Sequence, residues 1–136
     1  MNAKTFLDTN VLLYADDFDS PAKQKRAENL IEHLISTRTG CVSMQVLQEY
    51  FSTATRKLRM SPNFARRKIE LYTGFNVLTL QPVDLFAAID LHRDHQFSIW
   101  DALIVRAALI SDCEILYSED MQDGQRIDGL TIVNPF

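Results

Sequence analysis

Residues 98–117 read SIWDALIVRAALISDCEILY, an apolar helix pattern followed almost at once by a short apolar strand. We expect the helix from Ser98 to about Ser111, with Ser98 as its cap, and the strand from Glu114 to Tyr117. A helix and a strand joined by so short a connection are typical of proteins in which parallel strands alternate with helices.

The same alternation extends over the rest of the chain. Four more apolar strands are expected, at Thr5–Leu7, Cys41–Ser43, Asn76–Leu80 and Leu130–Val133. Further helices are expected at about 21–36, 44–58, 62–72 and from Pro82 to His92, and Ser-Pro pairs mark two of their starts. This order predicts an α/β fold, a three-layer α/β/α sandwich with a mainly parallel central sheet.

Composition indicates one domain over residues 1–136. Of the 136 residues, 46% are hydrophobic and 24% charged, and with four Gly and four Pro the chain has no linker-like segment. No apolar run is long enough for a membrane span, and Met1 leads directly into a strand pattern, so we expect a cytoplasmic protein with no membrane contact. Cys41 and Cys113 have no zinc-ligand spacing and are expected to be buried free thiols.

Asp8 directly follows the first apolar strand, and functional residues in parallel sheets gather at the carboxyl ends of strands. The alternative is that Asp8 caps the helix expected from Val11 onward. Asn10 is available for that cap, which would free Asp8 for another role.

Asp101 lies in an otherwise apolar helix. Its neighbours one turn on are Ile104 and Val105, so no local cation neutralises it, and an unpaired buried charge costs several kcal/mol. The alternative is a capping box between Ser98 and Asp101, which needs no further function. Both roles are compatible, and the apolar surroundings favour a ligand role for Asp101.

Asp120 and Glu49 are weaker candidates. Asp120 follows the strand ending at Tyr117 within an acidic segment that would also suit a surface turn. If this strand and the first strand are parallel neighbours, Asp120 and Asp8 leave the same edge of the sheet. Glu49 lies off the apolar stripe of its helix, so a solvated side chain is the default interpretation.

Several carboxylates at one edge would repel one another unless a divalent cation joined them. Mg²⁺ prefers such oxygen ligands and assists phosphodiester cleavage by activating water. His92 and His95 have helical spacing but no third ligand, so no zinc site is expected.

Four segments resemble the PIN-domain ribonucleases, and within them the VapC-like toxins of bacterial type II toxin–antitoxin modules. They are Phe6–Tyr14 (FLDTNVLLY), Gln48–Tyr50, Ile99–Ile104 (IWDALI) and Leu116–Asp120. The resemblance implies a PIN-like fold and an endoribonuclease that depends on Mg²⁺ or Mn²⁺. It further implies that Asp8 and Asp101 are the principal metal ligands and that Glu49 and Asp120 complete the acidic cluster, directly or through water.

The same resemblance implies accessory residues and partners. Ser118 fits the family's hydroxyl position, Asn10 belongs to the first motif, and Asp123 is an additional acid. Glu119 stands where the family more often has a basic residue, so either Glu119 or Asp120 faces the metal, and we choose Asp120. Family members cleave RNA, usually form homodimers and are inhibited by a cognate antitoxin. Residues 22–36 and 44–72 are the candidate surfaces for these two protein contacts.

The charge distribution points to one basic segment whose role the sequence does not decide. The formal charge is −4, which argues weakly against an RNA partner, yet six of the fourteen basic residues lie between positions 56 and 68. This segment could bind RNA phosphates, the antitoxin or only solvent.

Two other functions compete with the ribonuclease. A haloacid-dehalogenase-like phosphatase also begins with a strand and an aspartate, but it would need an Asp at position 10 and a Lys after position 68, and both are missing. A non-catalytic PIN-like module that binds RNA or protein is the alternative outside enzymes, and the complete set of four acids argues against it.

Overall fold

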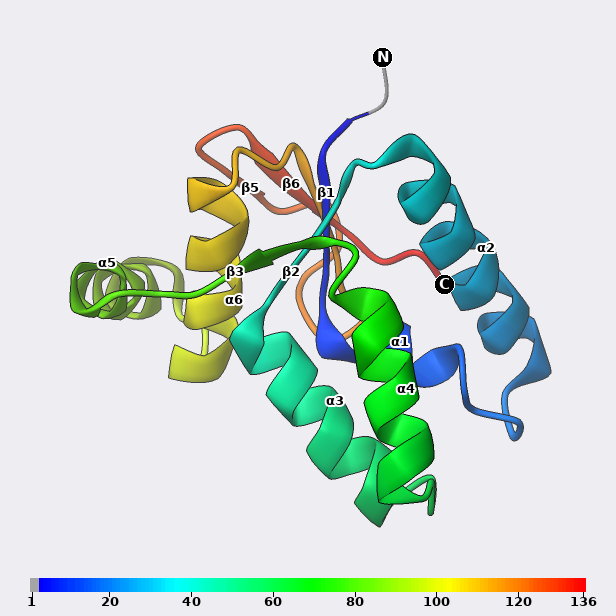
Figure 1. Cartoon of the computed structure of the whole chain (residues 1–136). Coiled ribbons are helices and arrows are strands. Elements are labelled where there is room, and N and C mark those ends of the chain that lie inside the picture. Colours follow the sequence, from blue (N-terminus) through cyan, green and yellow to red (C-terminus); the bar gives the residue numbers. More distant parts are fainter. Residues whose placement is uncertain (1–2) are drawn as a thin grey trace.

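The computed structural model describes residues 3–136, which form the expected three-layer sandwich (Figure 1). Its central sheet has the strand order β3-β2-β1-β4-β6-β5. The strands are β1 (Thr5–Leu7), β2 (Gly40–Ser43), β3 (Asn76–Leu78), β4 (Ile115–Tyr117), β5 (Arg126–Ile127) and β6 (Leu130–Val133). All neighbours pair in parallel except β5 and β6, so the predicted fold class is confirmed.

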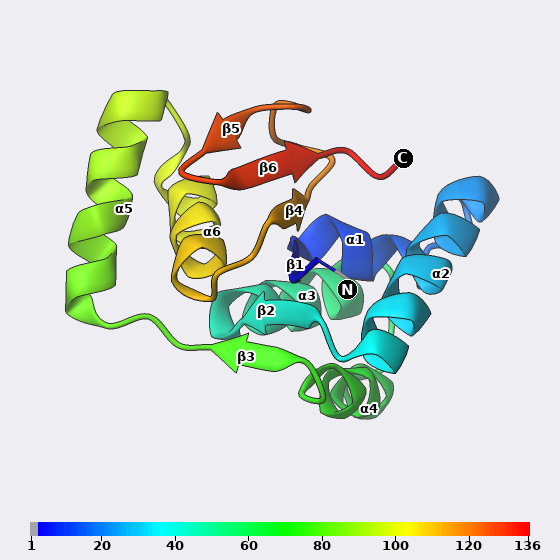
Figure 2. The ribbon, with the colours of Figure 1, turned by 90° about the horizontal axis from the view of Figure 1, so that it is seen from above.

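Helices cover both faces of the sheet. They are α1 (Thr9–Tyr14), α2 (Pro21–Thr37), α3 (Met44–Arg56), α4 (Pro62–Tyr72), α5 (Pro82–His95) and α6 (Ile99–Ile110). Figure 2 shows the molecule from above. In this view α5 and α6 lie on one side of the sheet, and α1, α2 and α4 lie on the other. Because both faces are covered, every residue of β1 and β2 is buried, and neither strand shows the alternation of a half-exposed strand.

Strand β1 lies at the centre of the sheet, between β2 and β4. Phe6 and Leu7 are fully buried there, as are Val42 on β2 and Leu116 on β4. Burial of these side chains from both layers removes their apolar surface from water, which is the main favourable contribution to folding. The position of β1 also places the residue that follows it, Asp8, in the middle of the sheet's carboxyl edge.

Several element bounds differ from the sequence prediction, and one strand was not predicted. The strand at Asn76 ends at Leu78, and the helix that begins at Met44 ends at Arg56. The two-residue strand β5 was not predicted, because a pairing this short carries no periodic pattern of its own. It forms through a hairpin in which Asp128 and Gly129 both have positive φ. Within residues 3–136, no helix is both long enough and apolar enough to cross a membrane.

Candidate active site

Two neighbouring strands bring the first two site residues together. Leu7 at the end of β1 pairs with Tyr117 at the end of β4, so the next residues, Asp8 and Ser118, emerge side by side. The Ser118 hydroxyl donates to Asp8 Oδ2 at 2.8 Å, and both residues are buried. The sequence prediction for Asp8 and Asp120 depended on β1 and β4 being parallel neighbours, and they are.

Asp8 is also the N-cap of α1, which corrects the expectation that Asn10 performs this role. Helix α1 begins at Thr9, so Asp8 occupies the cap position with extended backbone angles, and its Oδ1 accepts from the Thr9 amide at 2.7 Å. Asn10 lies inside the first turn and cannot cap it. Capping and site roles thus coincide in Asp8.

The Asp8 carboxyl is strongly perturbed. Burial raises its pKa from 3.8 to about 7, and the charges of Asp101 and Glu49 add to the rise. The hydrogen bonds from Ser118 and Thr9 oppose it, because they stabilise the ionised form. Because burial and neighbouring negative charges disfavour the ionised form of Asp8, a cation close to this carboxylate would stabilise it.

Asp101 lies in the first turn of α6. The Ser98 hydroxyl caps this helix by accepting from the Asp101 amide at 3.1 Å, as the predicted capping box requires of Ser98. Burial raises the pKa of the Asp101 carboxyl, and the charge of Asp120 raises it further. In the described part of the chain, no Lys or Arg forms an ion pair with it.

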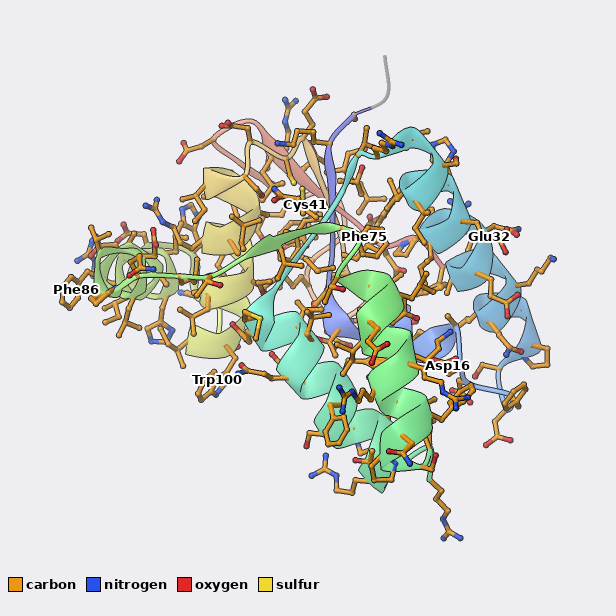
Figure 3. The ribbon with its side chains drawn as sticks, in the orientation of Figure 1. Asp16, Glu32, Cys41, Phe75, Phe86 and Trp100 are labelled. Carbon is orange, nitrogen blue, oxygen red and sulfur yellow. The ribbon has the colours of Figure 1, made fainter. Side chains whose placement is uncertain are left out.

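Glu49 reaches the same site from α3. The Gln45 amide donates to Glu49 Oε1 at 2.7 Å and to the Trp100 carbonyl at 3.2 Å, which ties α3 to the start of α6. Trp100 itself projects outward at this end of the molecule (Figure 3). Partial burial raises the pKa of the Glu49 carboxyl, and the charge of Asp101 adds to the rise. Glu49 is therefore electrostatically coupled to the other acids, although it is an exposed residue of its helix.

Asp120 faces the site through Asn10. The Asn10 amide donates to Asp120 Oδ2 at 3.1 Å, and the Asn10 carbonyl oxygen accepts from the Glu119 amide at 3.3 Å. Asn10 therefore uses both ends of its side chain to hold the loop after β4. Its role is to position Asp120, which the sequence pattern alone did not indicate.

Glu119 points away from the four acids, toward α1 and α2. Lys23 Nζ lies 2.6 Å from Glu119 Oε2, and the Tyr14 hydroxyl donates to Oε1 at 2.6 Å. The same ammonium lies over the rings of Tyr14 and Phe136. We call Tyr14, Lys23 and Glu119 the loop clamp, because together they hold the residue that precedes Asp120.

Asp123 has a separate partner. Its Oδ1 accepts from the Asn134 amide at 2.8 Å, which joins the loop to the end of β6. Its hydrogen bond therefore lies in the turn before β5, and not among the residues around Asp8.

The loop clamp gives a testable consequence. We expect Lys23→Met to loosen the loop after β4, since the Glu119 carboxylate would keep only the Tyr14 hydrogen bond and would lose its cation. Hydrogen exchange at the Glu119 and Asp120 amides should become several-fold faster, while exchange in the central strands stays unchanged. Lys25→Met removes an exposed cation on the same helix and is the matched control. Equal exchange in the two variants would contradict a positioning role for Lys23.

A cavity of about 290 Å³ adjoins Asp101 and Asp120. Its other walls include Gln96, Gln122 and Gln125, whose amides can both donate and accept hydrogen bonds. Across residues 3–136, no three Asp, Glu, His or Cys side chains form a group arranged to hold a metal ion. The four acids are thus coupled through their charges, as the pKa values of Asp8, Glu49 and Asp101 indicate, and are not gathered into a closed ligand cage.

Comparison with known proteins identifies the family and supports the fold. A family profile described as PIN domain matches residues 5–128. The fold is similar to a chain of a toxin–antitoxin complex from Klebsiella pneumoniae, with a TM-score of 0.72 and 19% identity over 97% of this chain and 98% of that one. A comparison of the sequence with curated proteins finds no match.

Two further solved structures share the fold. One is Mycobacterium tuberculosis VapC20, described as a sarcin-ricin loop cleaving toxin, with a TM-score of 0.67 and 19% identity over 85% of this chain and 89% of that one. The other belongs to DNA-bound VapBC from Salmonella typhimurium, with a TM-score of 0.69 and 18% identity over 99% of this chain and all of that one (100%). At such identities the similarity is one of fold.

Proposed function

Because the chain belongs to the PIN-domain family, we propose that it is an endoribonuclease that depends on Mg²⁺ or Mn²⁺ and serves as the toxin of a toxin–antitoxin pair. The single observation that carries this proposal is the cluster of Asp8, Glu49, Asp101 and Asp120. These acids come from four separate elements and have no ion-pair partner within the described residues. Burial raises the pKa values of Asp8, Glu49 and Asp101, and the charge of at least one other acid of the cluster adds to each rise.

The residues present fit a hard divalent cation. Carboxylate and amide oxygens are its preferred ligands, and Mg²⁺ is usually held by one or two carboxylates, several waters and the substrate phosphate. A Mg²⁺ ion bound in this way needs room for waters and for the phosphate, so an open arrangement of acids suits it better than a closed set of protein ligands. Asp8 and Asp101 are the proposed principal ligands, and Asp120 and Glu49 contact the ion directly or through water.

Within this proposal each residue has a defined task. The bound ion supplies a Lewis acid that activates water and stabilises charge on the phosphate. Ser118 and the Thr9 amide fix both oxygens of Asp8, and Asn10 fixes one oxygen of Asp120. Because these contacts exist before RNA binds, the carboxylates need little reorganisation during the reaction.

The toxin role draws support from the structural neighbours, which come from toxin–antitoxin complexes and a cleaving toxin. A cognate antitoxin is accordingly the proposed protein partner, and the cytoplasm is the proposed location. A homodimer is also proposed. Helix α5 offers a surface for it in addition to those suggested by the sequence, because three of its apolar side chains are exposed: Val83 at 65%, Phe86 at 63% and Ile89 at 45%. Figure 3 shows Phe86 on α5 at the edge of the molecule.

The proposal is tested by incubating the purified protein with total RNA in Mg²⁺, Mn²⁺ or EDTA. We expect cleavage with either metal and none with EDTA. Asp101→Asn should reduce the rate about 1,000-fold, since losing several kcal/mol of transition-state stabilisation costs a factor of ten per 1.4 kcal/mol. Asp123→Asn, which changes an acid of the same loop outside the cluster, is the matched control and should retain activity.

Each competing function predicts a different result. Cleavage that persists in EDTA, or in Asp101→Asn, would exclude the proposed mechanism. RNA binding without cleavage under every condition would favour a non-catalytic module. Release of phosphate from a small phosphomonoester, with RNA left intact, would favour a phosphatase.

A further inference from the structure

Helices α3 and α4 form an arm that extends side by side beyond the carboxyl edge of the sheet (Figure 1). The turn between them, residues 57–61, lies at the far end of the arm. This region carries most of the basic segment 56–68, whose role the sequence left open.

Four basic side chains of the arm have no acidic partner among the described residues. Lys68 pairs with Asp16 at 3.2 Å, and Arg66 pairs with Glu70 at 3.1 Å. Among the described residues, the remaining basic side chains of the arm have no ion-pair or hydrogen-bond partner and all are exposed: Arg56, Lys57, Arg59 and Arg67. We call these four the arm cations. In a chain of net charge −4, they concentrate positive charge on the arm.

Exposed aromatic rings lie beside the arm cations. Phe18 is 83% exposed and Phe64 is 49% exposed, although both are large apolar side chains. Together with Lys57 and Arg59, they line a cavity of about 510 Å³ between the loop after α1 and the end of the arm, and the loop also contributes three acids to its lining, Asp16, Asp17 and Asp19. Flat apolar rings next to cations are the usual components of a surface that binds single-stranded nucleic acid by stacking and charge.

The arm is continuous with the candidate active site. Arg56 follows Glu49 by seven residues in α3, which returns it to nearly the same helical face about 10 Å further along. This span corresponds to about three phosphate steps at the ~3.4 Å rise of a stacked strand. A strand held at the acidic cluster could therefore reach the arm cations without a bend.

We propose that the arm cations, with Phe18 and Phe64, bind the single-stranded part of the RNA substrate that flanks the cleaved bond. The inference rests on the proposed ribonuclease function and adds a binding surface to it. Arg56, Lys57 and Arg59 contact phosphates, and a base stacks in the cavity between the two Phe rings. Asp17 and Asp19 at the rim accept hydrogen bonds from the amino groups of bases.

The charge pattern favours RNA over a protein at this surface. A protein ligand of the arm would have to satisfy four cations with its own acids, whereas each phosphate of a strand satisfies one and releases a counterion. The resulting binding should depend steeply on salt, and this dependence can be measured without any cleavage.

The experiment uses an inactive Asp101→Asn background and a fluorescently labelled single-stranded RNA of mixed sequence. Binding is followed by anisotropy over a range of salt concentrations, with and without Mg²⁺. We expect R56Q/K57Q/R59Q to weaken binding by 10- to 100-fold at ~100 mM salt. The slope of log affinity against log salt should fall by about 2, or about 0.7 for each lost phosphate contact.

A matched variant, K25Q/R38Q/R126Q, removes the same charge from exposed positions elsewhere and should keep both affinity and slope. Replacement of Phe18 and Phe64 by Ser should weaken binding with little change of slope, because it removes stacking and no charge. Thermal unfolding of every variant verifies that it is folded.

Two results would overturn the proposal. One is an R56Q/K57Q/R59Q variant that binds RNA like its parent. The other is equal weakening by both triple variants, which would indicate an effect of overall charge. Unchanged RNA binding combined with loss of binding to the cognate antitoxin would assign the arm to a protein partner instead. Since cleavage is assayed separately on the wild type, failure of the ribonuclease function and failure of this surface are distinguishable.

Discussion

Asp8→Asn is expected to abolish RNA cleavage and, at the same time, to stabilise the metal-free protein above pH 7. An Asn side chain can place its carbonyl oxygen at the Thr9 amide, so the cap of α1 survives, and its NH2 group can donate to the Ser118 hydroxyl, which then accepts where it donated before. What disappears is a buried charge whose pKa lies about three units above its ordinary value. At 1.4 kcal/mol per unit, its removal is worth on the order of 4 kcal/mol as an upper limit. Loss of a principal metal ligand should slow cleavage about 1,000-fold or more.

The measurement pairs a cleavage assay with denaturant unfolding in EDTA at pH 8. Ser118→Ala is the opposite control, because it leaves the Asp8 carboxylate but removes its hydroxyl donor, and it should destabilise the protein. A gain in stability together with a loss of activity is the pattern of a residue retained for function. An Asp8→Asn protein less stable than the wild type at pH 8 would show that the ionised carboxylate is favourable in the fold.

The stability of the metal-free wild type should depend on pH in a direction set by Asp8. The folded protein retains the Asp8 proton up to about pH 7, whereas the unfolded chain loses it near 3.8. The folded state therefore binds more protons between these values, and the contribution of Asp8 to stability falls as pH rises through this window. Raised pKa values at Glu49 and Asp101 act in the same direction. Lowered values at Asp84 and Glu119 act in the opposite direction, since their contributions are lost as pH falls.

The difference in unfolding free energy between wild type and Asp8→Asn isolates the Asp8 contribution from these other groups. This difference should be small near pH 4 and should reach a plateau above pH 7. Mn²⁺ at 100 times its dissociation constant should then stabilise the wild type at pH 8 by about 2.7 kcal/mol and Asp8→Asn by much less. A flat difference curve would contradict the raised pKa, and an absent Mn²⁺ effect would contradict metal binding by Asp8.

Local signals predicted much of the fold. Apolar runs predicted β1 and β6 with correct bounds, and Ser61 and Ser98 were identified as helix caps because a cap and the amide it binds lie within three residues. The partial burial of Asp101 was predictable for a similar reason, since its helical neighbours are all apolar. Such features depend only on residues that are close in sequence.

The detailed roles in the candidate site were harder to predict. Which of Asp8 and Asn10 caps α1 depends on where the helix begins, and a shift of one residue exchanges their roles. Nothing near Glu119 in the sequence indicates whether it or Asp120 faces the other acids. That choice depends on Lys23, which is 96 residues away, and on Tyr14, which is 105 residues away.

The amino-acid sequence by itself determined the alternation of helices and strands, the α/β class and the identity of the acids at strand and helix ends. These follow from periodicity and capping, which act over a few residues. Only the tertiary structure decided that β1 and β4 are neighbours, that Ser118 donates to Asp8 and that the loop clamp turns Glu119 away from the cluster. Strand order brings distant segments together through packing of the whole core, and a pattern read along the chain does not contain that information.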